Sequence, residues 1–357
     1  MNREKESCVK ALEEGKRLTR GQWKTLVSDP DGEDAKILAQ KARRIREERY
    51  GRAVFIRGLI EFTDYCRNDC YYCGIRKSNG RAARYRLTRE EILECCRQGY
   101  ALGFRTFVLQ GGEDPFFTDE RMAELISAIK GEFRDCALTL SIGEREEESY
   151  RAFRKAGADR YLLRHETADP EHYRLLHPAG MSLERRMGCL RCLKELGYQT
   201  GAGFMVGSPG QTPDTLAADL EFLQELRPEM VGIGPFLPHR DTPFCGRPGG
   251  SVELTLYLLS LVRILLPDAL LPATTALGTA AADGREAGIL AGANVVMPNL
   301  SPAGAREKYQ LYDGKLCTGN AAAENLEALR RSMEAIGYRV VVDRGDYRGM
   351  IGEKRTD

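Results

Sequence analysis

The regular alternation of short apolar segments with longer helical segments restricts the fold of this chain more than any other feature of its sequence. Short apolar strands that are joined by helices are typical of a parallel sheet that is buried on both faces. The predicted strands are Ala53–Phe62, Thr106–Gln110, Ala137–Ser141, Arg160–Arg164, Gln199–Met205, Met230–Pro235, Leu271–Thr275 and Val295–Met297. The predicted helices are residues 88–102, Asp119–Phe133, Glu146–Ala156, Ser182–Leu196, Thr212–Leu226, Glu253–Leu266 and Arg285–Ala291.

Eight strand–helix units predict a closed (β/α)8 barrel, in which eight parallel strands form an inner ring. An open barrel of six strands is the alternative. Around the predicted barrel, residues 1–50 form a charged helical extension, and residues 321–357 hold a helix at about Ala321–Ile336 and a tail. The barrel itself covers residues 51–320, and we expect the tail from Arg339 onward to lie at its periphery.

Composition and charge exclude several classes of function. The 357 residues carry a formal net charge of +1, which argues against a protein that binds nucleic acid. No apolar run approaches the ~20 residues that span a membrane, and no secretory signal opens the chain. The 11 cysteines are unevenly spaced, which fits a reducing cytoplasm better than a disulfide framework.

Three cysteines follow the first predicted strand closely, at Cys66, Cys70 and Cys73. Thiolates in a C-x3-C-x2-C run can bind three irons of a four-iron cluster. No fourth cysteine follows at ferredoxin spacing, so one iron should remain open to a ligand from outside the protein. A zinc knuckle and scattered buried thiols are the alternatives, but zinc sites usually take four ligands from paired short spacings, and no second pair lies nearby.

The cysteine run, with Tyr72 before its last cysteine, resembles the signature of the radical S-adenosylmethionine (SAM) superfamily. The resemblance implies that SAM chelates the open iron and is cleaved reductively to a 5′-deoxyadenosyl radical. Gly111 and Gly112 resemble the superfamily turn that binds the SAM amino group, although Ser is also found at the first position in relatives. The residues expected to contact SAM are Tyr72, Gln110, Gly111, Gly112, Ser141, Arg164, Glu166, Arg186 and Met205.

Four further segments resemble the HydE family of [FeFe]-hydrogenase maturation enzymes, namely Arg164–Pro170, Gly232–Pro238, Pro272–Ala276 and Ala293–Asn299. This resemblance implies a sealed barrel cavity, companion maturases as partners, and an organometallic iron carbonyl–cyanide–cysteine substrate that is processed toward the hydrogenase di-iron centre. The residues expected at the substrate end are Arg57, Thr139, Thr274, Thr275, Met297, Tyr309 and Tyr312.

Some members of this family bind a second cluster through a C-terminal cysteine group. Here only Cys317 remains of that group, and no partner thiol follows it. The other cysteines outside the C-x3-C-x2-C run fall mostly on different predicted elements. We therefore expect one [4Fe-4S] cluster.

Two other radical SAM activities and one non-enzymatic role are alternatives. A biotin-synthase-like enzyme needs cysteines deep in the barrel for a second cluster, and the fourth and fifth predicted strands contain none. A methylornithine-synthase-like mutase needs no extra cysteines and stays open. An iron–sulfur protein that only transfers electrons would need a fourth protein ligand for its cluster, and none is evident.

A basic run follows the cysteines and contains Arg76, Lys77, Arg81, Arg84 and Arg86. Such a run is ordinarily a solvated surface. Beside a cluster it predicts docking of an acidic flavodoxin or ferredoxin that supplies the electron, because complementary charge raises the encounter rate.

Overall fold

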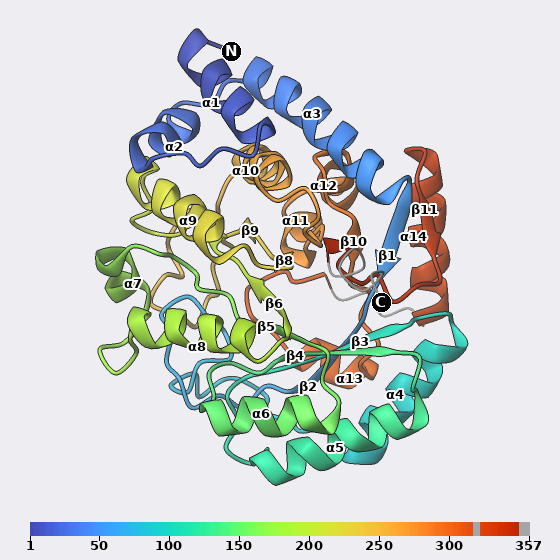
Figure 1. Ribbon diagram of the computed structural model, residues 1–357. Coiled ribbons are helices and arrows are strands. Elements are labelled where there is room, and N and C mark those ends of the chain that lie inside the picture. The colour runs from blue at the N-terminus through green and yellow to red at the C-terminus, as the bar shows by residue number, and fades with distance from the viewer. Residues whose placement is uncertain (317–321, 350–357) are drawn as a thin grey trace.

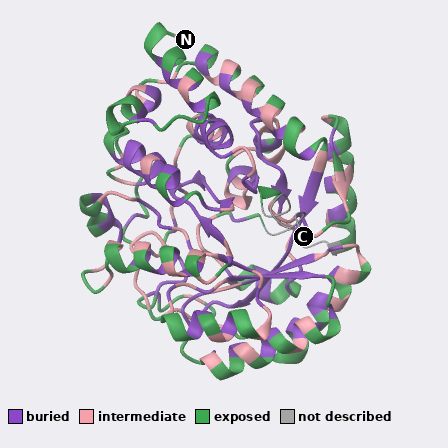
Figure 2. Ribbon diagram, viewed as in Figure 1, coloured by how far each residue is buried: buried purple, intermediate pink, exposed green. Residues whose placement is uncertain are grey.

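Parallel strands form a closed ring in the computed structural model of this protein, which describes residues 1–316 and 322–349. Helices surround the strands (Figure 1). Buried residues are concentrated on the strands and on the helix faces that contact them (Figure 2). Six strands pair in the order β2 (Gly58–Thr63), β3 (Thr106–Gly111), β4 (Ala137–Ser141), β5 (Arg160–Leu162), β6 (Gln199–Ala202) and β8 (Met230–Val231).

Two isolated parallel bridges and one further strand close the ring. The bridges join Met230 to Leu270 and Pro272 to Val295. Strand β10 (Val295–Val296) then pairs with β1 (Ala53–Ile56), which continues through Arg57 into β2. The described residues thus fill eight positions around the ring. The predicted closed barrel is confirmed, and the open six-stranded alternative is wrong. Two short strands, β7 (Met205–Val206) and β9 (Gly234–Pro235), pair beyond β6 and β8.

The predicted strand Leu271–Thr275, at the seventh position of the ring, is wrong. Pro272 has no N–H to donate to a ladder, so this segment makes only isolated bridges. Thr274 then turns the chain, because its hydroxyl accepts a hydrogen bond from the Leu277 N–H and caps helix α11 (Thr275–Ala280). The cap ends the extended conformation one residue before the predicted strand would have ended.

The helices of the barrel follow the prediction closely where their start signals are strong. Helix α4 begins with the expected capping box, in which Thr88 and Glu91 exchange hydrogen bonds. The prediction missed the short helices α7 and α13, although Asp169 and Pro170 are a common helix start. The observed helices are α4 (Arg89–Ala101), α5 (Asp119–Glu132), α6 (Glu147–Ala156), α7 (Pro170–Leu176), α8 (Leu183–Glu195), α9 (Pro213–Leu226), α10 (Val252–Leu265), α12 (Gly284–Leu290), α13 (Ala303–Lys308) and α14 (Ala322–Ala335).

Three N-terminal helices, α1 (Arg3–Glu13), α2 (Arg20–Val27) and α3 (Gly32–Tyr50), pack on the outside of the barrel. Helix α2 contacts α9, and α3 contacts α10. The buried guanidinium of Arg46 on α3 donates to the carbonyls of Gly51 and Ala53, which joins this extension to the start of β1. Within the described ranges, no helix combines the length and the apolar character needed to cross a membrane.

The segment after Arg339 closes the N-terminal end of the barrel, so the expectation that it lies at the periphery is wrong. Strand β11 (Arg339–Val341) pairs in parallel with β1. The chain then places Asp346 at 2.7 Å from the guanidinium of Arg160, whose side chain is fully buried at the start of β5. Arg160 also donates to the carbonyls of Arg344 and Gly345. A buried cation inside the barrel thus finds its carboxylate and carbonyl partners in this segment, which forms the barrel floor.

We predict that Asp346→Asn destabilises the fold by about 3 kcal/mol, because it leaves the Arg160 charge buried without a carboxylate. The unfolding midpoint in urea measures this change. The control is Glu327→Gln on α14, which removes an exposed carboxylate 3.8 Å from Arg330 and should change stability by less than about 0.5 kcal/mol. Equal midpoints for the two variants would show that the floor contact is not a major source of stability.

Candidate active site

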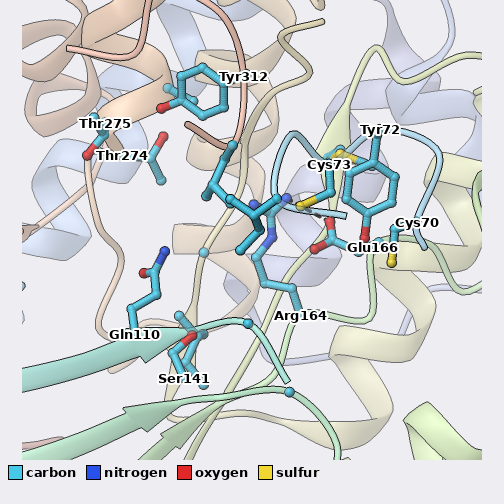
Figure 3. A pocket seen from close by; sticks show the side chains of 18 of the residues that line it. Cys70, Tyr72, Cys73, Gln110, Ser141, Arg164, Glu166, Thr274, Thr275 and Tyr312 are labelled. Carbon is cyan, nitrogen blue, oxygen red and sulfur yellow. Dashed lines mark ion pairs between the residues drawn. The ribbon is translucent and has the colours of Figure 1, made fainter. Parts of the chain in front are cut away.

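A cavity of about 330 Å³ opens at the C-terminal ends of the strands, where a barrel of this type holds its chemistry. Figure 3 shows its two ends, with Cys70, Tyr72 and Cys73 on one side and Thr274, Thr275 and Tyr312 on the other. The predicted site residues on its wall are Cys66, Cys70, Tyr72, Cys73, Gln110, Gly111, Gly112, Ser141, Arg164, Glu166, Arg186, Met205, Thr274, Thr275, Met297, Tyr309 and Tyr312.

Two predicted substrate residues, Arg57 and Thr139, do not line this cavity. Arg57 is buried deeper in the barrel, where its Nη1 lies 3.0 Å from the sulfur of Met230. Burial lowers the pKa of Arg57 well below its ordinary value, and the nearby Arg160 lowers it further. Thr139 is also buried, and its hydroxyl has no hydrogen-bond partner. Both residues face the barrel interior between the cavity and the floor.

The loop that carries the three cysteines is fixed at several points. Gly112 packs so closely on it that a Cβ atom there would lie 2.2 Å from the carbonyl oxygen of Tyr65. The N–H of Arg67 donates to the carbonyl of Glu113, and its guanidinium pairs with the Glu113 carboxylate at 2.9 Å. At the other end of the loop, the N–H of Gly74 donates to the carbonyl of Leu311. The glycine turn after β3 therefore holds the cysteines over the cavity.

The three thiols fit a cluster better than a single metal ion. Burial raises the pKa of all three, that of Cys70 to about 12, and the neighbouring cysteines contribute to the shift in Cys70 and Cys73. Such thiols lose their protons only when metal cations replace them. Among the described residues, no three His, Cys, Asp or Glu side chains converge on a site for one metal ion. Thiolates around a cube bind different irons, so they need not converge on one point.

Arg164 and Glu166 follow β5 and present unsatisfied polar atoms to the cavity. Their side chains form an ion pair at 3.0 Å, but the geometry is not that of a hydrogen bond. The buried Nε and Nη2 of Arg164 and Oε2 of Glu166 therefore have no hydrogen-bond partner. Glu166 also has a φ of +65°, a conformation that is rare for a residue with a side chain and concentrated at functional sites. A ligand with a carboxylate and hydroxyl groups, such as SAM, would satisfy these atoms.

Arg186 on α8 contacts the backbone of Arg164 and the carboxylate of Glu144. Its Nε pairs with Glu144 at 2.5 Å, and its Nη1 donates to the carbonyl of Arg164. The Arg186 charge is therefore already matched by a carboxylate, whereas the guanidinium of Arg164 keeps unused donors.

A second buried ion pair, which the sequence analysis did not identify, lines the cavity. Lys315 reaches from the segment after α13 to the carboxylate of Glu61 on β2, and it also donates to the carbonyl of Tyr309 at 2.8 Å. Asn299 donates to the other carboxylate oxygen of Glu61 at 2.7 Å. The only available signal was a single charge within the apolar strand Leu59–Phe62.

His177 is another residue that the sequence analysis did not identify. It lies directly after α7, and its Nε2 is 3.2 Å from the hydroxyl of Tyr72. Burial lowers the pKa of His177 to about 3, so the ring is neutral near pH 7. A lone histidine in a polar loop gave no sign of this contact.

The basic run after the cysteines is mostly occupied by internal contacts. Arg76 pairs with Asp69 at 2.6 Å, and Arg86 pairs with Asp114 at 2.7 Å. Arg84 donates to backbone carbonyls of the same loop, including that of Ile75. These side chains hold the loop together. Arg81 is exposed but pairs with Asp241 at 2.8 Å, so Lys77 supplies most of the unmatched exposed charge in the run.

Comparison with known proteins places this site in a family. The Radical SAM superfamily profile matches residues 60–223. The [FeFe] hydrogenase maturase subunit HydE of Thermotoga maritima is 46% identical over 324 residues, which cover 91% of this chain and 92% of that protein. The 3-methylornithine synthase of Methanosarcina barkeri is 31% identical over 341 residues, 95% of each chain. The crystal structure of methylornithine synthase (PylB) matches with a TM-score of 0.81 at 30% identity, over 94% of this chain and 97% of that one.

The barrel, the cysteine loop and these matches define a SAM-dependent enzyme of the radical SAM class. Within that class, the chain belongs to the HydE family. Membership of this class implies a [4Fe-4S] cluster and SAM as cofactors.

We predict that Arg164→Lys weakens SAM binding about tenfold, because a lysine keeps the charge but loses the planar fork that binds a carboxylate bidentately. Equilibrium dialysis measures the affinity, and the visible absorbance of the cluster confirms that it is intact. Arg174→Lys on the exposed face of α7 is the matched control and should bind SAM like the parent. An unchanged SAM affinity in Arg164→Lys would show that Arg164 does not bind SAM and only pairs with Glu166.

Proposed function

We propose that this protein uses SAM and one [4Fe-4S] cluster, bound by Cys66, Cys70 and Cys73, to help assemble the di-iron centre of [FeFe]-hydrogenase. The observation that supports this proposal most strongly is the arrangement of a single cavity. Three half-buried thiols and an unsatisfied Arg164–Glu166 pair lie at one end, and a wall of hydroxyl groups lies at the other. One cavity would therefore hold SAM and a substrate side by side.

The residues at the cysteine end of the cavity are proposed to bind the cofactors. When bound, the cluster would supply the electron that cleaves SAM to a 5′-deoxyadenosyl radical. Arg164 would hold the SAM carboxylate, Glu166 would accept hydrogen bonds from the ribose hydroxyls, and Gly112 would let the backbone approach the amino group. Ser141, Gln110 and Met205 complete the wall around this end.

The substrate is proposed to be an organometallic iron carbonyl–cyanide–cysteine species at the end formed by Thr274, Thr275, Met297, Tyr309 and Tyr312. The support is the 46% identity to the HydE protein of Thermotoga maritima over nearly the whole chain. Companion hydrogenase maturases would supply this species and receive the product. Arg57 and Thr139, which lie below the cavity, are proposed to line a deeper extension of the substrate space.

A second candidate function is the formation of 3-methylornithine. The observation in its favour is the similarity to 3-methylornithine synthases over the full length, at 31% identity and with a TM-score of 0.81 for the solved structure. Both functions need the same SAM chemistry, so cleavage of SAM does not separate them. An assay for 3-methylornithine, run beside an assay for hydrogenase activation with the companion maturases, does separate them.

We propose an acidic flavodoxin or ferredoxin as the electron donor and the cytoplasm as the location. Half-exposed positions in the cysteine loop support docking beside the cluster, and the exposed Lys77 supplies positive charge there. Arg81 is also exposed, but Asp241 matches its charge. The ten cysteines that the structure describes are all unpaired, which fits a reducing compartment.

We predict that Cys73→Ala abolishes the formation of 5′-deoxyadenosine from SAM under dithionite, because the cluster loses one of its three thiolates. Liquid chromatography of the reaction measures this product. Cys192→Ala, which removes a thiol on α8 away from the cavity wall, is the control and should cleave SAM like the parent. Parental activity in Cys73→Ala would contradict the proposed function.

We predict that reconstituted protein binds about four irons per chain, the content of one cube. The triple variant of Cys66, Cys70 and Cys73 to Ala should bind almost none, and iron analysis with ferrozine measures both. Cys317, where some relatives begin a second cluster motif, lies outside the described residues. About eight irons in the parent, or a cluster signal in the triple variant, would reveal a second site.

A further inference from the structure

The last residue of α7 and the residue that follows it contact the cysteine loop at two successive positions. The carbonyl of Leu176 accepts a hydrogen bond from the N–H of Tyr71 at 3.0 Å. The side chain of His177 meets the hydroxyl of Tyr72 at 3.2 Å. The segment from Leu176 to His177 therefore holds the part of the loop that lies between Cys70 and Cys73.

The surroundings of His177 determine which of its ring nitrogens carries the proton. Nδ1 lies 3.0 Å from the carbonyl oxygen of Tyr173, and a carbonyl only accepts, so Nδ1 carries the hydrogen. Because the buried ring is neutral, Nε2 carries a lone pair and must accept a hydrogen bond from the Tyr72 hydroxyl. The ring is also stacked on Tyr173 at 4.0 Å and meets the Tyr72 ring edge-on at 5.4 Å. His177 is thus held in place by packing on both sides.

The Tyr72 hydroxyl has a second possible acceptor, because Figure 3 shows it directed toward Cys70. Hydrogen bonding from Tyr72 also opposes the rise that burial causes in the pKa of the Cys70 thiol. One hydroxyl has one hydrogen and can donate it to only one of the two. A hydrogen bond to a cluster sulfur makes a cluster easier to reduce, and therefore a weaker reductant. The direction of the Tyr72 hydroxyl thus bears on the electron that SAM cleavage needs.

We propose that His177 is a positioning residue that accepts the Tyr72 hydrogen bond and so directs this hydrogen away from the Cys70 sulfur. This inference rests on the proposed binding of the cluster by Cys66, Cys70 and Cys73. His177 touches neither the cluster ligands nor the cavity, and it acts through Tyr72. Without its acceptor, the hydroxyl turns to Cys70, and the reduction potential of the cluster becomes more positive.

The test is a double-mutant cycle on the midpoint potential of the reconstituted cluster, measured by a redox titration followed by electron paramagnetic resonance. The parent, His177→Phe, Tyr72→Phe and the double variant are compared. His177→Phe should shift the potential to more positive values. The double variant should have the potential of Tyr72→Phe, because no hydroxyl remains to turn.

One further variant, together with Tyr72→Phe from the cycle, keeps the proposal open to refutation if His177→Phe binds little iron. His177→Gln restores an acceptor through its amide oxygen and should return the potential toward that of the parent. Tyr72→Phe alone should leave the potential close to that of the parent, because the hydroxyl does not donate to Cys70 when His177 is present. A more negative potential in Tyr72→Phe would overturn the proposal.

Two results of the cycle would also overturn it. An equal shift from His177→Phe with and without the Tyr72 hydroxyl would give His177 a structural role only. No shift in either background would remove any influence on the cluster. A failure of the proposed function can be told apart from these outcomes. The iron content of the variants of Cys66, Cys70 and Cys73 tests whether these cysteines bind the cluster, and that test does not involve His177.

Discussion

The contact between Gly112 and the backbone of Tyr65 supports the whole site, because it brings the end of β3 against the loop that follows β2. A side chain at Gly112 would overlap the Tyr65 carbonyl, so the loop would have to move and take all three cysteines with it. The same turn continues into Glu113, which holds Arg67 through both its carbonyl and its carboxylate. Two neighbouring strand ends thereby fix the position of the three cysteines relative to Arg164 and Glu166. The arrangement follows from the parallel barrel, in which these ends meet at one face.

Local patterns in the sequence were sufficient to predict the barrel and most of the cavity wall. The cysteine spacing, the glycine turn after Gln110 and the polar ends of the strands are short-range features, and the barrel topology brings them together. The sequence could not predict partners that are distant in the chain. Nothing near Arg160 indicates Asp346, nothing near Glu61 indicates Lys315, and nothing near Tyr72 indicates His177. At the seventh ring position a local conflict decided the outcome, since Pro272 cannot donate to a ladder and Thr274 caps a helix.

The two ends of the cavity differ in how their charges are satisfied. Glu61 has partners in Lys315 and Asn299, and its pKa is raised by burial although Lys315 opposes that shift. Arg164 and Glu166 remain with unused atoms. A satisfied buried pair fixes geometry, because breaking it would leave an isolated charge in an apolar setting. Lys315 thus holds the segment after α13 across the mouth of the barrel, whereas the Arg164 end is prepared for a ligand.

The floor of the barrel has a consequence for the order in which the protein can be made. Asp346 follows Arg160 by 186 residues, and at typical rates of synthesis this distance corresponds to roughly 10–40 s on the ribosome. During that interval β5 carries a cation that its neighbouring strands cannot neutralise. The strands can pair as they emerge, but the interior of the barrel cannot reach its final packing until the segment after β11 has been made. Final folding of this enzyme is therefore a late event in its synthesis, and only a chain that extends through Asp346 has the floor contacts of its barrel.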